Sequence, residues 1–204
     1  MTEYTFEGIR VRLKDHPEVY PPGDDTFLLL HAVREARGRV LELGTGNGLI
    51  AVFLAMRGSE VLATDLNPHA VRLASKNAAL NRVRLEVVRA DIFDGIRCRF
   101  DAVIFNPPYL PTAPEEVTGD RWLDASVNGG SDGREHLKRF LAGLSAHLTR
   151  EGRGYVVASS LSGGMPRPPA GLHDKVAASA KLEFEQLRVH ELWTEDMDGM
   201  EGAH

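Results

Sequence analysis

Hydrophobic positions along this chain follow two alternating rhythms. Helical spacing of apolar residues occupies 24–36, 48–58, 66–81 and 134–148, and short apolar runs typical of buried strands occupy 39–43, 60–65, 84–91, 100–106 and 154–161. Two further extended segments are expected within 175–193, where apolar and polar residues alternate. Strands that alternate with helices predict a parallel sheet joined by right-handed crossovers, with helices on both faces.

Turn and cap residues divide these segments cleanly. Asn67 and Pro68 are suited to the cap and first position of the helix 66–81. The segment 162–171 must be a loop, because it holds three prolines and three glycines. With 204 residues, of which 43% are hydrophobic, the chain is expected to form one domain, 1–204, with an N-terminal extension at 1–18 and a frayed acidic tail at 194–204.

Composition limits the partners that the protein can have. A formal net charge of −5 disfavours a protein whose main role is to wrap a nucleic acid backbone. The chain starts without a signal peptide and holds no apolar run long enough to span a membrane, so a cytoplasmic location is expected. The single cysteine, Cys98, excludes an internal disulfide, and the histidines lack a ligand spacing such as H-E-x-x-H, so no metal is predicted.

Three glycines, Gly44, Gly46 and Gly48, lie in the segment LELGTGNGL between a strand and a helix. Glycine permits a tight turn and lets a ligand touch the backbone, and the helix start offers N–H donors. A dinucleotide fingerprint is disfavoured because its third glycine would fall on Leu49, and no Lys-Ser or Lys-Thr pair follows to make a P-loop. The segment predicts a site for a small-molecule cofactor, and a plain glycine-rich turn is the alternative.

Polar residues end the neighbouring strands. Asp65 ends the second predicted strand, Asp91 the third and Asn106 the fourth. Pro107 forces the chain out of the strand after Asn106, which by itself is an ordinary turn signal. Ligands in doubly wound sheets bind beyond the carboxyl ends of the strands, so these side chains and the glycine turn are expected to face one crevice.

Taken together, these segments resemble class I S-adenosylmethionine-dependent methyltransferases. ELGTGNG resembles the family's first motif, Asp65 in TDLNP its ribose-binding acid, Asp91 in ADIF its adenine-contacting acid, and NPPY the motif of enzymes that methylate a planar nitrogen. Over residues 19–193 the chain is similar to the HemK-like protein-glutamine N5-methyltransferases in their archaeal and eukaryotic short form. Residues 1–18 are expected to be too few for the helical domain that bacterial members carry. The resemblance implies a Rossmann-like α/β fold with a seven-stranded, mostly parallel sheet.

The resemblance also implies S-adenosylmethionine as cofactor, S-adenosylhomocysteine as product, and no metal. The segments 19–33 and 128–135 are similar to the family's opening over the cofactor and to its later glycine loop. Where the family places a helix after its fifth strand, this chain has the proline-rich loop instead. The implied cofactor-binding residues are Tyr20, Pro22, Thr26, Glu42, Gly44, Gly46, Gly48, Asp65, Leu66, Asp91, Ile92 and Asn106.

The implied catalytic residues are Asn106, Pro107 and Tyr109. An amide nitrogen is a poor nucleophile because its lone pair is delocalised. The Asn106 side-chain oxygen and the Pro107 carbonyl can each accept one N–H, so that the lone pair points at the sulfonium methyl, and the Tyr109 ring offers a flat wall for a flat substrate. This mechanism is orientation and hydrogen bonding that strengthens as charge develops on nitrogen.

The resemblance implies a release factor as substrate, methylated on the glutamine amide of its Gly-Gly-Gln loop. The first alternative is methylation of an adenine or guanine amino group in DNA or RNA, because the same tetrapeptide serves those enzymes. Such an enzyme would need a recognition domain or basic groove, which this sequence does not show. The second alternative is a non-catalytic cofactor-binding scaffold, although no motif position is damaged.

A partner is implied at the predicted strand 84–90. The resemblance places this strand at the sheet edge, where a small zinc-binding activator subunit adds its own strand. The alternative is an edge that Arg84, Glu86 and Arg89 merely protect by charge. Nucleic acid is not expected as the main partner, and no membrane contact is expected.

Overall fold

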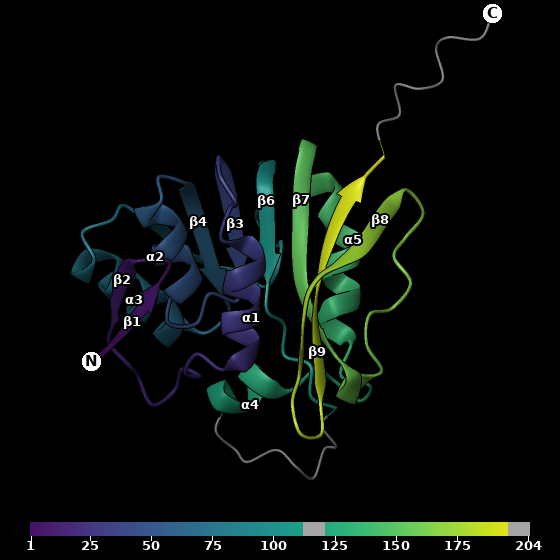
Figure 1. Ribbon diagram of the computed structural model, residues 1–204, viewed down its shortest axis with the longest axis horizontal. Helices are drawn as coiled ribbons and strands as arrows, with labels where there is room; N and C mark the ends of the chain where they lie inside the picture. The colour runs from purple at the N-terminus through teal and green to yellow at the C-terminus, as the bar shows by residue number, and fades with distance from the viewer. Residues whose placement is uncertain (112–120, 196–204) are drawn as a thin grey trace, which may run out of the picture.

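The computed structural model describes residues 1–111 and 121–195, so most of the predicted frayed tail lies outside the described residues. Figure 1 shows a central twisted sheet between two layers of helices. The elements in chain order are β1 Thr2–Phe6, β2 Ile9–Leu13, α1 Asp24–Val33, β3 Arg39–Leu43, α2 Leu49–Met56, β4 Glu60–Asp65, α3 Pro68–Leu80, β5 Glu86–Arg89, β6 Phe100–Phe105, α4 Arg121–Val127, α5 Glu135–His147, β7 Leu148–Ser159, the 3-10 turn η2 Ser160–Ser162, β8 Leu172–Lys181 and β9 Gln186–Thr194.

The central sheet has seven strands in the order β5-β4-β3-β6-β7-β9-β8. The first five pair in parallel, and β9 pairs antiparallel with both β7 and β8. Apolar residues of α1, α2 and the end of α3 are buried against one face, and those of α5 against the other. The predicted α/β fold with a mostly parallel seven-stranded sheet is confirmed, and the segment 84–90 is at the sheet edge, as β5.

The start of β7 differs from the prediction. The strand begins at Leu148, not at Gly154, because Leu148 pairs with Phe100 before the register shifts and Arg153 pairs with Ala102. The residues between Leu148 and Gly154 are mainly polar, so no apolar rhythm marks them. The loop after β7 holds only the 3-10 turn before β8 begins, as its prolines and glycines predicted.

Residues 1–18, predicted as an extension, include a β-hairpin that the prediction missed. In β1 and β2, Phe6 pairs with Ile9, so the turn is Glu7-Gly8, with φ of 48° and 77°. Positive φ at both turn positions is what a two-residue hairpin with the strands' natural twist requires. Val11 and Leu13 are buried in the same apolar cluster as α1 and α2. The alternation within TEYTF and IRVRL was a usable signal for this hairpin.

Asn77 in α3 and Asn81, which directly follows this helix, hold the end of β2 and the backbone that leaves the hairpin. Asn81 accepts a hydrogen bond from Arg12 N (2.8 Å) and donates one to Arg12 O (2.6 Å). One turn earlier, the fully buried Asn77 accepts from Lys14 N (2.8 Å) and donates to Lys14 O (3.1 Å) and to Asn47 O (2.8 Å). The two side-chain amides make the hydrogen bonds to Arg12 and Lys14 that a neighbouring strand would otherwise make. Asn77 also fixes the glycine turn after β3.

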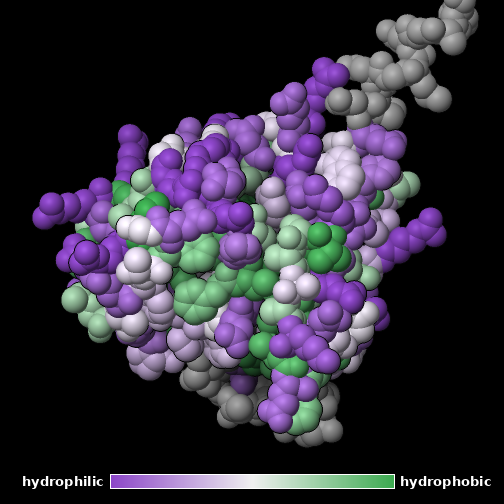
Figure 2. Space-filling model, viewed as in Figure 1, coloured by the Kyte–Doolittle hydropathy of each residue, from purple (hydrophilic) through white to green (hydrophobic). Residues whose placement is uncertain are grey.

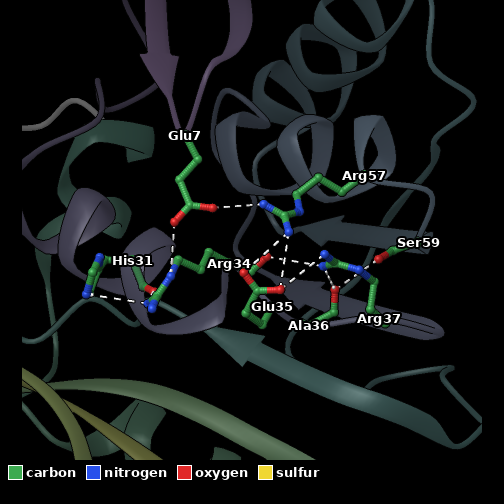
Figure 3. A network of polar contacts seen from close by, with 8 residues as sticks. All are labelled: Glu7, His31, Arg34, Glu35, Ala36, Arg37, Arg57 and Ser59. Atoms are coloured by element: carbon green, nitrogen blue, oxygen red, sulfur yellow. Dashed lines mark hydrogen bonds and ion pairs between the residues drawn. The ribbon is translucent and has the colours of Figure 1, made fainter.

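The hairpin turn is held by a second set of polar contacts, shown in Figure 3. Glu7 is paired with Arg57 at 2.9 Å and with Arg34 at 3.1 Å, and Arg57 also reaches Glu35 at 3.2 Å. The Arg57 side chain is only 17% exposed, so its pair with Glu7 is less screened than an ordinary surface ion pair. The turn is thus tied to the ends of both α1 and α2.

Aromatic side chains of the hairpin pack against α1 and α2. Tyr4 packs on Phe27 with ring centroids 5.6 Å apart, and Phe6 meets Phe53 edge-on at 5.4 Å. Figure 2 shows hydrophobic residues across the middle of this face, with hydrophilic residues around them. Among the described residues, no helix has the length and apolar character needed to cross a bilayer.

We expect Asn77→Ala to lower the free energy of unfolding by about 2–4 kcal/mol. The substitution removes the hydrogen-bond partner of one backbone donor, Lys14 N, and of two backbone acceptors, Lys14 O and Asn47 O, at a largely buried position. Urea denaturation measures this. The matched control is Ser75→Ala on the same helix, which removes only an exposed bond to Val71 O and should change stability by less than about 0.5 kcal/mol. Equal stability of the two variants would show that the asparagine does not hold the hairpin.

Candidate active site

A cavity opens beyond the carboxyl ends of β3, β4, β5 and β6, where the parallel pairing brings the strand tips together. Every predicted site residue except Gly48 lines it. The lining set that sequence reasoning named is Tyr20, Pro22, Thr26, Glu42, Gly44, Gly46, Asp65, Leu66, Asp91, Ile92, Asn106, Pro107 and Tyr109. The sequence therefore identified residues that the fold brings to one place.

The glycine turn after β3 needs its glycines for two different reasons. Gly44, Gly46 and Gly48 all have positive φ, of 61°, 57° and 84°. A Cβ on Gly46 would meet nothing within 4 Å, so this position is open for a ligand to approach the backbone. A Cβ on Gly48 would lie 3.1 Å from the Ala74 Cβ, so this glycine caps α2 and lets α3 pack closely. Gly48 is a packing residue and does not line the cavity.

Glu42 is a buried acid beneath the turn. Its Oε2 accepts hydrogen bonds from the Thr45 hydroxyl at 2.5 Å and from Ala51 N at 3.1 Å. Burial raises the pKa of Glu42 to about 8, and the nearby charge of Asp65 adds to this, although both hydrogen bonds oppose it. The side chain joins the turn to the first turn of α2.

Asp65, at the tip of β4, is oriented by backbone donors. Its Oδ2 accepts from Gly46 N at 2.9 Å and its Oδ1 from Asn67 N at 2.8 Å. Burial raises the pKa of Asp65 above its usual value, and these backbone hydrogen bonds oppose the increase. Each oxygen keeps a second lone pair, so the carboxylate can accept two more hydrogen bonds from a ligand in the cavity.

Asp91 follows β5 and is held differently. Its Oδ2 is 2.9 Å from the Arg139 guanidinium of α5, and its side chain is 35% exposed. Part of its hydrogen-bonding capacity is therefore directed at a neighbouring helix. Ile92, which follows it, is buried with a φ of 51°, an uncommon value for a branched residue.

Asn106 is the polar group best placed for chemistry. Its Nδ2 donates to Asp25 Oδ2 at 3.0 Å, which fixes the orientation of the amide. Its Oδ1 is buried and has no hydrogen-bond partner among the described residues. An unpaired buried acceptor costs stability, and such groups concentrate at functional sites. The arrangement offers one oriented, unsatisfied acceptor to whatever enters the cavity.

Tyr109 shares the same carboxylate, because its hydroxyl donates to Asp25 Oδ2 at 3.3 Å. Burial and the Asp25 charge raise the pKa of Tyr109, so the phenol stays protonated. Behind it, a Cβ on Gly133 would lie 2.4 Å from the Tyr109 carbonyl, and Gly129 N donates to Leu110 O at 2.9 Å. The glycine loop 128–135 thus supports the backbone of the tetrapeptide from behind, a role that requires glycine at 133.

The comparisons with known proteins agree with this geometry. Residues 12–121, more than half of the chain, match the family model described as Methyltransferase small domain. The chain belongs to this methyltransferase family. Its resemblance to class I methyltransferases, and within them to the HemK-like group, is confirmed.

Two relatives and one solved structure give the range of similarity. A Methanocaldococcus jannaschii protein, provisionally named protein N5-glutamine methyltransferase, is 39% identical over 92% of this chain and 97% of its own length. The Schizosaccharomyces pombe protein named eRF1 methyltransferase catalytic subunit mtq2 is 32% identical over 73% of this chain and 76% of its own. A Thermus thermophilus 16S rRNA N2 G1207 methyltransferase, solved with AdoMet and guanosine, matches with a TM-score of 0.64 at 18% identity, over 95% of this chain and 50% of that one. At that identity the solved structure supports the fold alone.

Sequence reasoning missed two residues of this methyltransferase site. Asp25 lies in the first turn of α1, where an acid is commonplace, so nothing in the sequence marked it as a site residue. Asn67 was expected only as the cap of α3, where it accepts from His69 N at 2.8 Å, but it also donates to Glu18 O at 2.6 Å and so holds the chain just before the cavity wall. Neither role has a local signal, because each partner is distant in sequence.

We expect the methyltransferase to lose stability through Glu42 as pH rises from about 5 to 8. The pKa of Glu42 is about 8 in the folded chain against an ordinary value of 4.5, so the unfolded chain binds fewer protons across this window and each pH unit costs up to about 1.4 kcal/mol. Glu42→Gln removes this titration. Between about pH 5.5 and 8.5, wild type should lose about 3 kcal/mol relative to the variant in urea denaturation of the cofactor-free chains. Parallel pH profiles would place the Glu42 pKa below this window.

Proposed function

We propose that this chain transfers the methyl group of S-adenosylmethionine to the side-chain amide nitrogen of the glutamine in the Gly-Gly-Gln loop of a peptide chain release factor. The observation that carries the proposal is the Asn106 Oδ1 beside Pro107 and Tyr109, a buried acceptor to which no described residue donates a hydrogen bond. A primary amide is a flat group with two N–H donors, and an oriented carbonyl oxygen is the partner that such a group needs.

The cavity suits this cofactor electrostatically. Its lining includes the carboxyl groups of Asp25, Glu42, Asp65 and Asp91 but no lysine or arginine among the described residues. A sulfonium cofactor is positively charged at sulfur, so a cavity without cations favours it, whereas a site built for phosphates would need basic groups. The backbone at Gly46 is open to close approach, which fits an adenosine or methionine group lying against the turn.

Residue roles follow from the same contacts. Asp65 would accept the ribose hydroxyls through its two free lone pairs, and Asp91 and Ile92 would lie beside the adenine, with Leu66. Tyr20 and Pro22, which precede α1, and Thr26 in its first turn would cover the cofactor, while Glu42 and the glycines shape the turn beneath it. When bound, S-adenosylmethionine supplies an electrophilic methyl group on sulfur.

The protein's own contribution to the reaction is orientation and exclusion of water. Asn106 Oδ1 and the Pro107 carbonyl each accept one N–H of the substrate amide, which holds its lone pair toward the methyl group. Positive charge grows on nitrogen during transfer, so both hydrogen bonds strengthen, and such positioned contacts contribute several kcal/mol. Asp25 fixes the Asn106 amide and the Tyr109 hydroxyl, so it is a positioning residue.

The substrate class is supported by the relatives. One is named for N5-glutamine methylation of protein and another for methylation of eRF1. A nucleobase amino group is equally flat, and the solved rRNA methyltransferase shares the fold, but the cation-free cavity and the net charge of −5 favour a protein substrate. The negative net charge of the chain also argues against nucleic acid as the main partner.

We also propose that the open edge of β5 binds a small zinc-binding activator subunit by adding a strand. The S. pombe relative is named a catalytic subunit, which supports an assembly of this kind. Ala90 N donates to Asp65 O at 3.2 Å, and N–H directions alternate along a strand, so Val88 N faces β4 while Val87 N and Arg89 N face the open edge. Two backbone donors of β5, Val87 N and Arg89 N, therefore point away from the only strand with which β5 pairs among the described residues.

The substrate proposal is tested by incubating the purified chain with methyl-labelled cofactor and a release factor of its own organism. Label should enter the release factor and be absent when the glutamine of the Gly-Gly-Gln loop is replaced by alanine. Parallel pools of RNA and DNA test the rival substrates. Label in nucleic acid alone would overturn the glutamine assignment, and no label anywhere, with the cofactor bound, would favour a scaffold.

We expect Asn106→Ala to lower turnover about a hundredfold or more while cofactor affinity stays nearly unchanged. Asp65→Ala is the converse control, since loss of charged hydrogen bonds worth roughly 1.5–3 kcal/mol should weaken cofactor binding. Calorimetry gives the affinities and single-turnover labelling gives the rates. If Asn106→Ala retains full turnover, Asn106 has no part in the reaction.

Val87→Pro should abolish activation by the partner subunit, because proline removes a donor that faces the open edge. Val87→Ala keeps the donor and should still be activated, which makes it the matched control. Co-purification and activity with and without the subunit measure the effect. A lone chain that is monomeric, soluble and fully active would show that no such subunit is required here.

A further inference from the structure

Two histidines and a glutamate gather beside the cavity wall. His69 Nε2 lies 2.9 Å from Glu18 Oε2, and the His16 and His69 rings face each other with centroids 4.8 Å apart at an interplanar angle of 32°. One potential ligand atom from each of the three residues lies within 4.8 Å of the other two. All three residues are partly buried, and no other such trio occurs within residues 1–111 and 121–195.

We propose that His16, Glu18 and His69 bind a divalent transition-metal ion of the zinc type, with water completing the coordination. Two imidazoles and one carboxylate form a donor set that zinc accepts, whereas calcium and magnesium prefer oxygen ligands alone. This proposal departs from the sequence prediction that no metal is present. The sequence could not reveal the site, because the third ligand comes from a distant helix.

The backbone on both sides of the site is fixed without the ion. Glu18 O accepts from Asn67 Nδ2 at 2.6 Å, and Asn67 Oδ1 accepts from His69 N at 2.8 Å. One asparagine therefore holds the segment that carries Glu18 against the first turn of α3, where His69 lies. Two of the three ligands are pre-positioned, which lowers the ordering cost of binding.

The distances are compatible with tetrahedral coordination. Ligands about 2.0–2.1 Å from zinc lie about 3.3 Å from one another, close to the Glu18–His69 separation already present. To complete the site, the His16 ring must move closer to Glu18 and His69. It then loses a weak hydrogen bond, in which its Nδ1 accepts from Glu18 N at 3.2 Å. An ion pair between His69 and Glu18 would explain their contact, but it does not require a second imidazole ring, tilted by 32°, at a centroid distance of 4.8 Å from the first.

A metal ion at this position would affect the wall of the cavity. Val19, Tyr20 and Pro21 follow Glu18 and line the cavity. Asn67 N donates to Asp65 Oδ1 at 2.8 Å, so the α3 end of the site adjoins the carboxylate at the tip of β4. A bound ion would tie the wall of the cavity to the strand tip that carries Asp65.

The test is direct metal binding to the full chain. Metal is stripped with EDTA, the chelator is removed, and Zn²⁺ is titrated by calorimetry and by competition with a chromophoric chelator. We expect one Zn²⁺ per chain with a dissociation constant of about 1 μM or lower. His16→Ala, His69→Ala and Glu18→Gln should each weaken binding about tenfold or more, and Zn²⁺ should raise the melting temperature of wild type but not of these three variants.

His31→Ala, on the exposed side of α1, is the matched control and should bind like wild type. Circular dichroism verifies that each variant is folded, and Glu18→Gln keeps the side-chain shape if a histidine variant fails to fold. The proposal is overturned if wild type binds no more Zn²⁺ than His69→Ala, or if His16→Ala binds as tightly as wild type. None of these measurements uses methyl transfer, so their outcome is independent of the proposed activity.

Discussion

The parallel pairing of β3 with β4 on one side and β6 on the other is the constraint on which the site depends. Parallel strands end at the same edge of a sheet, so the turn after β3, Asp65 after β4 and Asn106 after β6 must meet. The helix α2, which follows β3, is buried on one face of the sheet, and the helix α5, further along the chain after β6, is buried on the other, and ligand crevices form at such a switch point. The cavity therefore follows from the strand order before any side chain is considered.

Within that crevice, the hydrogen-bond acceptors of Asp65 and Asn106 have different surroundings. The carboxylate of Asp65 is satisfied by backbone donors, which hold it in place and still leave lone pairs free. The Asn106 oxygen has instead no hydrogen-bond donor within residues 1–111 and 121–195, and the hydrogen bond from its Nδ2 to Asp25 fixes the amide in this orientation. The hydrogen bond to Asp25 orients the Asn106 amide and keeps its Oδ1 available to a ligand. The buried oxygen lowers the stability of the fold, and the surrounding packing offsets this loss.

Asparagine side chains connect the irregular segments to the regular ones. An amide both donates and accepts, so one side chain can satisfy the N–H and the carbonyl of an unpaired stretch of backbone. Asn77 does this for Lys14 while also holding the carbonyl of Asn47 in the glycine turn, and Asn67 does it between α3 and Glu18. The N-terminal hairpin, the cavity wall and the glycine turn are thereby fixed to one helix.

The sequence by itself determined the succession of α1, β3, α2, β4, α3, β5, β6, α5 and β7 along the chain, because apolar periodicity, glycines and prolines act locally, but it did not predict the hairpin β1–β2 or the helix α4. It also marked the strand-end residues Asp65 and Asn106 and the glycine turn, since their positions follow from where each apolar run stops. Tertiary structure alone decided the roles of Asp25 and Asn77, the packing role of Gly48 against Ala74, and the meeting of His16 with His69. Each of these depends on a partner that is distant along the chain, and no local pattern encodes which distant groups a fold will bring into contact.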